Sequence, residues 1–379
     1  SVSSPNAADL TWEKVITTNI GVDLGMFNNR LTFSGDIYQR DTKDILTNGM
    51  DLPSLYGASI PKMNAADIRT KGWEITLGWM DQFQLASRPF RYSATFGLAD
   101  NTAKVRHFNN PEKLLGTPYD GQNLGDIWGY EVDGYFKTDE EAATYETDQT
   151  YVNSFINTIA VDAGLHAGDL KFVDLDGDNV IQPTLSANKP RDQKVIGNSM
   201  PRYTYSARLS ADYAGFDLAV LFQGVGKQDW YPGEETFLYW GPYSRPYQTF
   251  IPTNFMQDVW SEDNPNAKFP RPIGYVGIGG GRRELSAVNT KYLENVAYCR
   301  LKNLTFGYTL PRKLLRRAGI DRLRVYFSGE NLLTFTPLST KYIDPEIAGA
   351  QNTWAAGKTN VSSTYPTNKQ FTFGLNITF

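Results

Sequence analysis

The sequence predicts an all-β protein, a transmembrane antiparallel β-barrel to which this chain contributes about nine strands. Three observations predict this fold: strict period-two alternation, a regular alternation of short and long connections, and an aromatic content of 13% at a mean hydropathy of only −0.42. No stretch approaches the ~18 consecutive apolar residues of a transmembrane helix. The strands of a barrel do not show such a stretch, because apolar and polar side chains alternate along them and their mean hydropathy stays low.

Alternation is clearest at the C-terminus, where Phe371, Phe373, Leu375, Ile377 and Phe379 share one strand face and small polar residues share the other. The same pattern recurs in 73–79, 90–98 and 203–213. A soluble sandwich would cover such a face with a second sheet, whereas a membrane barrel turns it to lipid. Alternation alone leaves both folds open.

The connections separate these two folds. We expect strands at 13–25, 30–41, 70–80, 89–106, 202–214, 216–226, 297–310, 321–333 and 370–379. Short links at 26–29, 81–88, 214–215 and 311–320 then alternate with long links at 42–69, 107–201, 227–296 and 334–369. In an up-and-down barrel all long links share one rim, as in outer-membrane barrels with short periplasmic turns and long extracellular loops. The pattern favours the barrel, with the four long links outside the cell.

The strand count predicts an incomplete barrel. Nine strands would leave two unpaired edges, and unpaired backbone groups are costly in lipid, so we expect the remaining strands to come from another piece of polypeptide. Residues 1–5 have neither the basic nor the apolar region of a signal peptide, so we expect an exported protein to begin upstream of them.

Charge and motifs exclude several functions. A net charge of −4 and a pI of 5.4 argue against nucleic acid as a partner. The single cysteine, Cys299, allows no intrachain disulfide, and His107 and His166 have no cysteine at metal-ligand spacing. No nucleophile elbow or phosphate loop is present, so we expect no enzymatic activity and no required cofactor.

One acidic segment is a candidate calcium site. Asp174, Asp176 and Asp178 occupy alternate positions, as carboxylates do in calcium loops, and the Val180 carbonyl and Asp192 could complete the ligand set. A full EF-hand is excluded, because Asn179 stands at the usual glycine position. A structural calcium ion and a metal-free Asp/Gly turn both stay open.

Aromatic residues are unusually dense in 227–256, and they could contact a substrate or a partner, or pack a long loop into its own small core. The candidates for contact in this segment are Trp230, Tyr231, Tyr239, Trp240 and Tyr243, with Trp128 and Trp354 elsewhere.

Five motifs, in order along the chain, resemble the C-terminal region of SusC/RagA-family TonB-dependent transporters. They are TKGWEIT (70–76), GDIWGY with DGYF (125–136), GDLKFVDLDGD (168–178), YCRLKNLTFGYTLP (298–311) and SGENLLT (328–334). The resemblance implies a barrel of about 22 strands in a bacterial outer membrane, with an N-terminal plug domain that is absent from this chain and that engages TonB. It also implies a SusD-like surface lipoprotein as partner, and a role for the terminal strand (Phe371, Phe373, Leu375, Ile377 and Phe379) as barrel-assembly signal.

The whole chain, 1–379, is thus expected to be the C-terminal part of one barrel domain. Two functions stay open: an active importer of oligosaccharides or peptides, and a passive porin-like or adhesive, lectin-like surface protein. The choice between glycan and peptide is also open, because aromatic vestibules suit both.

Overall fold

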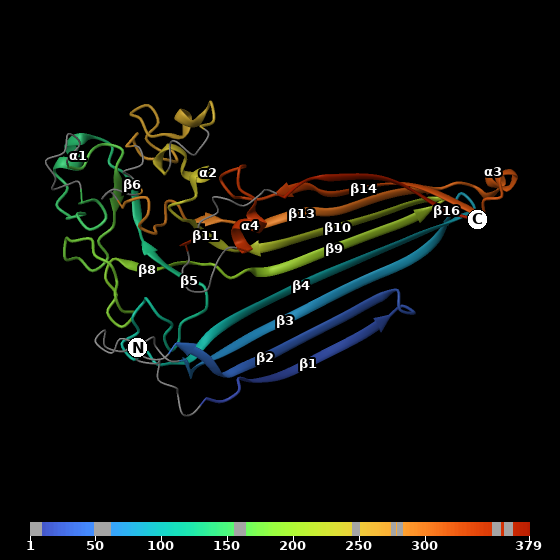
Figure 1. Ribbon diagram of the computed structural model, residues 1–379, viewed down its shortest axis with the longest axis horizontal. Helices are drawn as coiled ribbons and strands as arrows, with labels where there is room; N and C mark the ends of the chain where they lie inside the picture. Colours follow the sequence, from blue (N-terminus) through green and yellow to red (C-terminus); the bar gives the residue numbers. More distant parts are fainter. Residues whose placement is uncertain are drawn as a thin grey trace, which may run out of the picture.

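The computed structural model describes residues 10–48, 62–154, 164–244, 251–273, 278, 283–350, 358–359 and 367–379. Nine long strands form one antiparallel sheet, here called the wall sheet, in the order β1-β2-β3-β4-β9-β10-β13-β14-β16 (Figure 1). Each overlaps one of the strands expected from the sequence. Their bounds are Lys14–Met26, Leu31–Asn48, Lys62–Leu85, Arg88–Phe108, Arg202–Tyr213, Phe216–Lys227, Tyr298–Thr309, Arg322–Phe335 and Gln370–Thr378.

Strands β2 and β3 are longer than expected. β2 continues to Asn48 and β3 begins at Lys62, so their pairing extends through two register irregularities between Thr42 and Leu46. The expected connection 42–69 therefore narrows to 49–61, which lies outside the described residues. In β2 and β3 the alternation of apolar and polar residues ends before the strand does. Backbone hydrogen bonding between the two strands continues beyond it, because it does not depend on the type of side chain once the register is set.

Two of the short connections are tight two-residue turns. β3 and β4 are joined by Ala86 and Ser87 alone, at φ of 46° and 62°, so the expected link 81–88 shrinks to two residues. Ala214 and Gly215 join β9 to β10 at φ of 52° and 93°. Two central residues at positive φ match the right-handed twist of a hairpin. The fourth short connection contains α3 (Arg312–Leu315) and η6 (Arg316–Ala318).

The long connections leave the opposite end of the wall sheet, as the alternation of links predicts (Figure 1). Their described residues within 109–201, 228–297 and 336–359, here called the loop layer, contain three small sheets: β5 with β8, β6 with β7, and β12-β11-β15. The elements are β5 (Asp126–Tyr130), β6 (Val132–Tyr135), α1 (Asp139–Ala143), β7 (Leu170–Phe172), β8 (Gln193–Asn198), β11 (Asp229–Pro232), α2 (Phe237–Trp240), η3 (Gly241–Tyr243), η4 (Phe255–Asp258), β12 (Glu294–Asn295), α4 (Pro345–Ala350) and β15 (Lys358–Thr359). The described parts of these three long links are thus folded, although the sequence indicated a core only as one alternative for 227–256.

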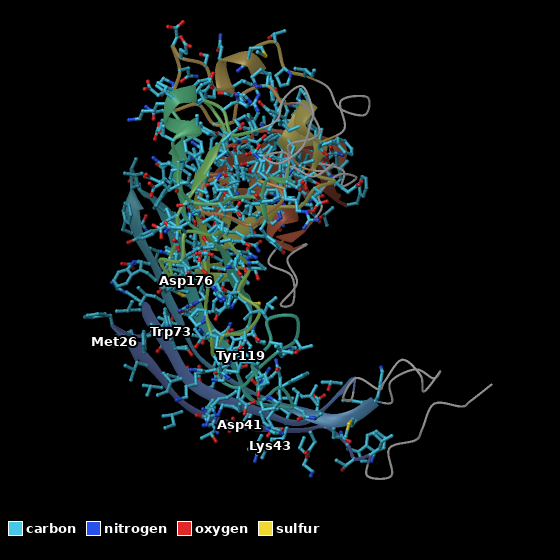
Figure 2. The ribbon with its side chains drawn as sticks, turned by 90° about the vertical axis from the view of Figure 1, so that its left-hand side faces the viewer. Met26, Asp41, Lys43, Trp73, Tyr119 and Asp176 are labelled. Atoms are coloured by element: carbon cyan, nitrogen blue, oxygen red, sulfur yellow. The ribbon has the colours of Figure 1, made fainter. Side chains whose placement is uncertain are left out.

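One face of the wall sheet is apolar and exposed. Cross-strand neighbours on it include Phe373 beside Phe327, Phe327 beside Phe306, and Phe306 beside Leu218. Phe373 is 80% exposed, and along β16 the apolar residues alternate with polar residues on the other face of the strand. Figure 2 shows how the sheet curves. Such a face is stable only against a non-aqueous phase, so lipid is its natural neighbour. Among the described residues, no helix is long and apolar enough to cross a membrane.

A buried ion network joins the wall sheet to the loop layer. Arg300 of β13, whose side chain is 2% exposed, donates to Asp344 at 2.6 and 2.7 Å and to Glu346 at 2.6 Å. Lys302, on the same strand, donates to Glu346 at 2.9 Å. Because both carboxylates flank the start of α4, the network fixes the connection after β14 against the wall.

Candidate functional site

The five aromatic candidates of 227–256 lie in the core of the loop layer. The exposed fractions of Trp230, Tyr231 and Trp240 are 0%, and those of Tyr239 and Tyr243 are 4% and 2%. Their polar atoms are bonded inside the core: Tyr231 Oη donates to the Leu285 carbonyl at 2.6 Å, and Trp240 Nε1 donates to the Gly233 carbonyl at 3.0 Å. The rings meet one another edge to face, as for Tyr239 and Trp240 at 4.8 Å between centroids.

This burial corrects the expected contact role of these five residues. A ring covered on both faces cannot stack on a sugar or a partner, so Trp230, Tyr231, Tyr239, Trp240 and Tyr243 are packing residues in this conformation, the alternative that the sequence left open. Trp128, in β5, is half-buried. Trp354 lies outside the described residues.

Three of the predicted calcium ligands come together. Asp174, Asp176 and Asp192 each offer a carboxylate oxygen, and these atoms lie within 4.8 Å of one another. Asp192 is fully buried and accepts the NH groups of Leu175 at 2.9 Å and Gln182 at 2.7 Å. Burial nevertheless raises the pKa of Asp192. Such a trio of hard oxygen donors has the chemistry that calcium requires.

Backbone NH groups lower the pKa of Asp174. Burial acts to raise the pKa of Asp174, but the NH groups of Asn179 and Gly177, both at 2.7 Å, outweigh burial and lower it. Asn179 adopts φ of 61° at the position where calcium loops carry glycine. The turn is thus stable in its own backbone geometry.

Asp178 is not part of this trio, and the Val180 carbonyl stays a predicted ligand. Asp178 Oδ2 accepts Arg191 Nη1 at 2.7 Å, while its Oδ1 accepts the NH of Val180 at 2.9 Å. Arg191 also donates to Asp176 at 3.2 Å, so a guanidinium already neutralises part of the cluster. Arg191 was not among the residues predicted for this site, although its position directly before Asp192 was an available signal.

The loop layer also contains an open hollow of ≈ 520 Å³ that the sequence did not indicate. Its wall includes the Lys268 side chain, whose ammonium lies 4.1 Å from the centroid of the Tyr239 ring and 3.6 Å from Glu294 Oε1. Burial lowers the pKa of Lys268, and Glu294 acts against this shift. Ser339 and Thr340, from the connection after β14, add hydroxyl groups. The arrangement offers hydrogen bonds beside apolar surface, which suits a polar organic ligand.

Four of the five predicted assembly residues lie on β16, the last strand of the wall sheet, and Phe379 directly follows it. Phe371, Phe373, Leu375, Ile377 and Phe379 are 63%, 80%, 64%, 47% and 83% exposed. β16 pairs with β14 along Arg322–Glu330 and with no other described strand. Their role in assembly stays a prediction.

Comparison with known proteins agrees with this architecture. The sequence model of the family "TonB dependent receptor-like, beta-barrel" matches residues 1–332. TonB-dependent receptor P3 of Formosa agariphila is 29% identical over 98% of this chain and 34% of its own length. TonB-dependent receptor SusC of Bacteroides thetaiotaomicron is 22% identical over 100% of this chain and 33% of its own length. The chain therefore spans about a third of the length of these curated relatives.

Solved structures show the same fold. The RagAB peptide importer in its open-open state superposes with a TM-score of 0.67 at 23% identity, over 100% of this chain and 36% of that one. The resemblance inferred from the motifs is confirmed, as is the antiparallel barrel architecture. The chain belongs to the TonB-dependent receptor-like β-barrel family of the bacterial outer membrane and, within it, resembles the SusC and RagA proteins.

Proposed function

We propose that the chain forms part of the wall and the outer vestibule of an active importer, which moves oligosaccharides or peptides into the periplasm together with a SusD-like lipoprotein. The wall sheet supplies the lipid-facing barrel, and the loop layer supplies the extracellular vestibule. Energy comes from TonB, which acts through a plug domain encoded outside residues 1–379. The chain itself performs no catalysis.

One observation carries this proposal: every long connection described is gathered into one folded layer at one end of the wall sheet. Long loops are common to outer-membrane barrels, but loops that only line the mouth of a passive pore need no aromatic core of their own. A folded layer with its own aromatic core and open hollows provides instead a rigid surface on which a ligand and a capping lipoprotein can be bound. The two relatives named above are TonB-dependent receptors, which also supports the proposal of an active importer.

Within the layer, we propose a structural role for calcium at Asp174, Asp176 and Asp192. Three carboxylates within 4.8 Å repel one another, and Arg191 relieves only the Asp176 side of the cluster. A divalent ion relieves the rest. It would rigidify the segment between β7 and β8, and so the rim that faces a partner.

The test is uptake by cells that produce the full-length transporter from its own gene cluster. Fluorescently labelled oligosaccharides and peptides are supplied in parallel, in a wild-type and a tonB-deleted background. If the chain is part of an importer, one of the two ligand classes enters the cells. This uptake is lost when tonB is deleted, and it is also lost when the lipoprotein gene is deleted. The class that enters identifies the substrate.

Two outcomes would overturn the proposal. Uptake that persists without TonB would identify a passive channel. Binding of either ligand to the cell surface with no TonB-dependent entry would identify an adhesive, lectin-like protein. Copurification of the lipoprotein with the transporter provides a separate check on the partner.

A further inference from the structure

One connection differs from the others at the end of the wall sheet where the short connections lie, here called the short-turn end. Ala86 with Ser87, and Ala214 with Gly215, show that two uncharged residues are enough to join neighbouring strands. The connection from β13 to β14 instead contains the segment 311–321, here called the basic turn, which includes α3 and η6. Figure 1 shows α3 beyond the ends of the strands, at the end opposite to the loop layer. Joining two strands therefore does not account for the length of the basic turn.

The basic turn carries positive charge that is not neutralised. It contains Arg312, Lys313, Arg316 and Arg317 with the single acidic residue Asp321, which leaves an excess of three positive charges. Arg312 pairs with Asp321 at 2.6 Å. Lys313, Arg316 and Arg317 are exposed and form no ion pair with any other residue that the structure describes. These three cations are available to an anion from outside the chain.

An apolar side chain lies among these charges. Leu314 is 70% exposed, whereas the next residue, Leu315, is 5% exposed. Arg317 follows Leu314 by three positions, so the two side chains share one side of the helical turn. An exposed leucine beside exposed cations is typical of a surface that lies at a membrane interface.

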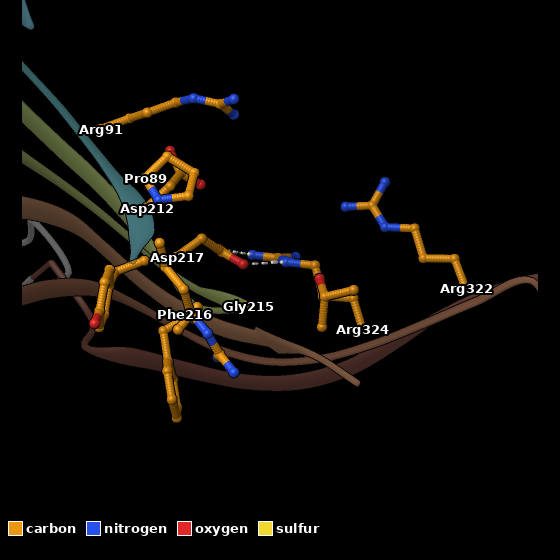
Figure 3. A pocket seen from close by; sticks show the side chains of 12 residues that line it. Pro89, Arg91, Asp212, Gly215, Phe216, Asp217, Arg322 and Arg324 are labelled. Atoms are coloured by element: carbon orange, nitrogen blue, oxygen red, sulfur yellow. Dashed lines mark hydrogen bonds and ion pairs between the residues drawn. The ribbon is translucent and has the colours of Figure 1, made fainter. Parts of the chain in front are cut away.

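A row of aromatic side chains on the apolar face marks the depth of the short-turn end in the membrane. The residues of the row are neighbours in register from β3 to β13: Phe83, Phe90, Tyr213, Phe216 and Tyr308. The rings of Phe216 and Tyr308 lie 4.5 Å apart between centroids. Figure 3 shows Phe216 pointing away from Arg91 and from the Asp217–Arg324 pair, which lie on the polar side. Outer-membrane barrels carry such aromatic girdles where the hydrocarbon core meets the headgroups.

The basic turn begins at Pro311, three residues after Tyr308 of this row. At a rise of about 3.3 Å per residue and a strand tilt of about 40°, Pro311 lies about 8 Å farther along the membrane normal than Tyr308. The headgroup layer on each side of the hydrocarbon core is about 5–8 Å thick. Because short turns face the periplasm in outer-membrane barrels, the basic turn lies at the headgroups of the periplasmic leaflet.

We infer that the basic turn binds anionic phospholipids of the periplasmic leaflet, with Lys313, Arg316 and Arg317 at the lipid phosphates and Leu314 at the edge of the acyl chains. Lysine and arginine both donate to phosphate oxygens. A free phosphate ion or an acidic protein would account for the cations, but neither accounts for an exposed leucine next to an aromatic girdle. Lipid binding holds the short-turn end at a fixed depth. It concerns contact with the membrane, so it is independent of whether the transporter imports a ligand.

Lipid retention by the full-length transporter tests the inference. The transporter is reconstituted in nanodiscs that contain equal amounts of phosphatidylethanolamine and phosphatidylglycerol, and native mass spectrometry counts the lipids that stay bound. The test variant combines Lys313→Gln, Arg316→Gln and Arg317→Gln, which removes the three unpaired cations. Heat-modifiable mobility checks that each variant still forms a folded barrel.

A matched control removes the same amount of charge from the loop layer. It combines Lys137→Gln, Lys189→Gln and Lys341→Gln, at three exposed lysines that lie at the other end of the wall sheet and form no ion pair with a described residue. This control changes the net charge of the transporter as the test variant does. Any difference between the two variants therefore reports the position of the charge.

The wild-type transporter should retain phosphatidylglycerol over phosphatidylethanolamine by about tenfold or more, since each cation at an anionic surface contributes about fivefold to binding. The test variant should retain the two lipids about equally, and the control should keep the wild-type ratio. Leu314→Gln should lower the number of both lipids retained, because it removes an apolar contact that does not depend on the headgroup charge.

The inference is overturned by equal retention of the two lipids in the wild type, by an unchanged ratio in the test variant, or by an equal loss in the control. Unchanged retention in Leu314→Gln would overturn the apolar contact. Displacement of phosphatidylglycerol by inorganic phosphate or by poly-L-glutamate, at constant ionic strength, would assign the cations to a free anion or to an acidic protein and would overturn the inference as well. TonB-dependent uptake is measured separately, so failure of the proposed function leaves these outcomes unaffected.

Discussion

The wall sheet and the loop layer use the same aromatic and aliphatic residues in opposite ways. In the wall, Phe373 and Leu375 are 80% and 64% exposed, whereas Trp230 and Trp240 in the layer are 0% exposed. The layer has water around it and must build its own core from rings, while the wall leaves its apolar face for lipid. The comparison teaches that side-chain type does not decide burial in this chain, whereas the surrounding phase does.

The largest effect is expected from the removal of β16, the last strand of the wall sheet. Deleting residues 371–379 from the full-length transporter should abolish surface assembly, because β14 would lose its partner along eight of its nine residue pairs with β16. The measurement is heat-modifiable mobility and surface labelling in outer membranes. Thr372→Ala plus Asn376→Ala, on the polar face, is the control and should assemble. Normal yield of the deleted protein would contradict both the topology and the assembly role.

A second change should unfold the layer and spare the wall. Trp240→Ala removes a fully buried ring that meets Tyr239 at 4.8 Å and Tyr292 at 5.0 Å, and should cost about 3–5 kcal/mol. Limited proteolysis should then cut within 228–297 while the heat-modifiable barrel persists. Trp12→Ala, at a side chain that is 90% exposed, is the control. Loss of the barrel together with the layer would mean that the two regions fold as one unit.

The third change tests the junction between the regions. Arg300→Gln leaves Asp344 without its guanidinium and Glu346 with Lys302 alone, which should cost about 3 kcal/mol. Hydrogen exchange should accelerate in 336–350 more than in β13. Arg312→Gln breaks an exposed pair instead, and should change stability by about 0–1 kcal/mol. Equal effects of the two substitutions would refute an anchoring role for Arg300.

The smallest effect is expected from calcium. At millimolar calcium and a dissociation constant of about 10⁻⁴ to 10⁻³ M, binding should stabilise the layer by about 1 kcal/mol. Thermal unfolding of the layer with calcium and with chelator measures this difference. Asp176→Asn should abolish it, whereas Asp178→Asn should not, because Asp178 lies with Arg191 outside the trio. The metal-free turn is supported if chelator has no effect on the wild-type layer.

The sequence by itself determined the wall. Period-two alternation depends only on neighbours along the chain, so Phe371 to Phe379 and the eight strands before them could be located, together with the side on which each connection lies. The end of β2 and the start of β3 could not be located from the sequence, because the two strands remain paired through residues that do not alternate between apolar and polar.

Tertiary structure alone decided how the loop layer folds and which of the predicted site residues come together. Burial of Trp230 and Trp240 and the pairing of Asp178 with Arg191 depend on contacts between segments that are separated in the sequence. Local patterns carry no information on such contacts, because the free energy of a core or an ion pair depends on which chain segments approach one another and on the water they displace.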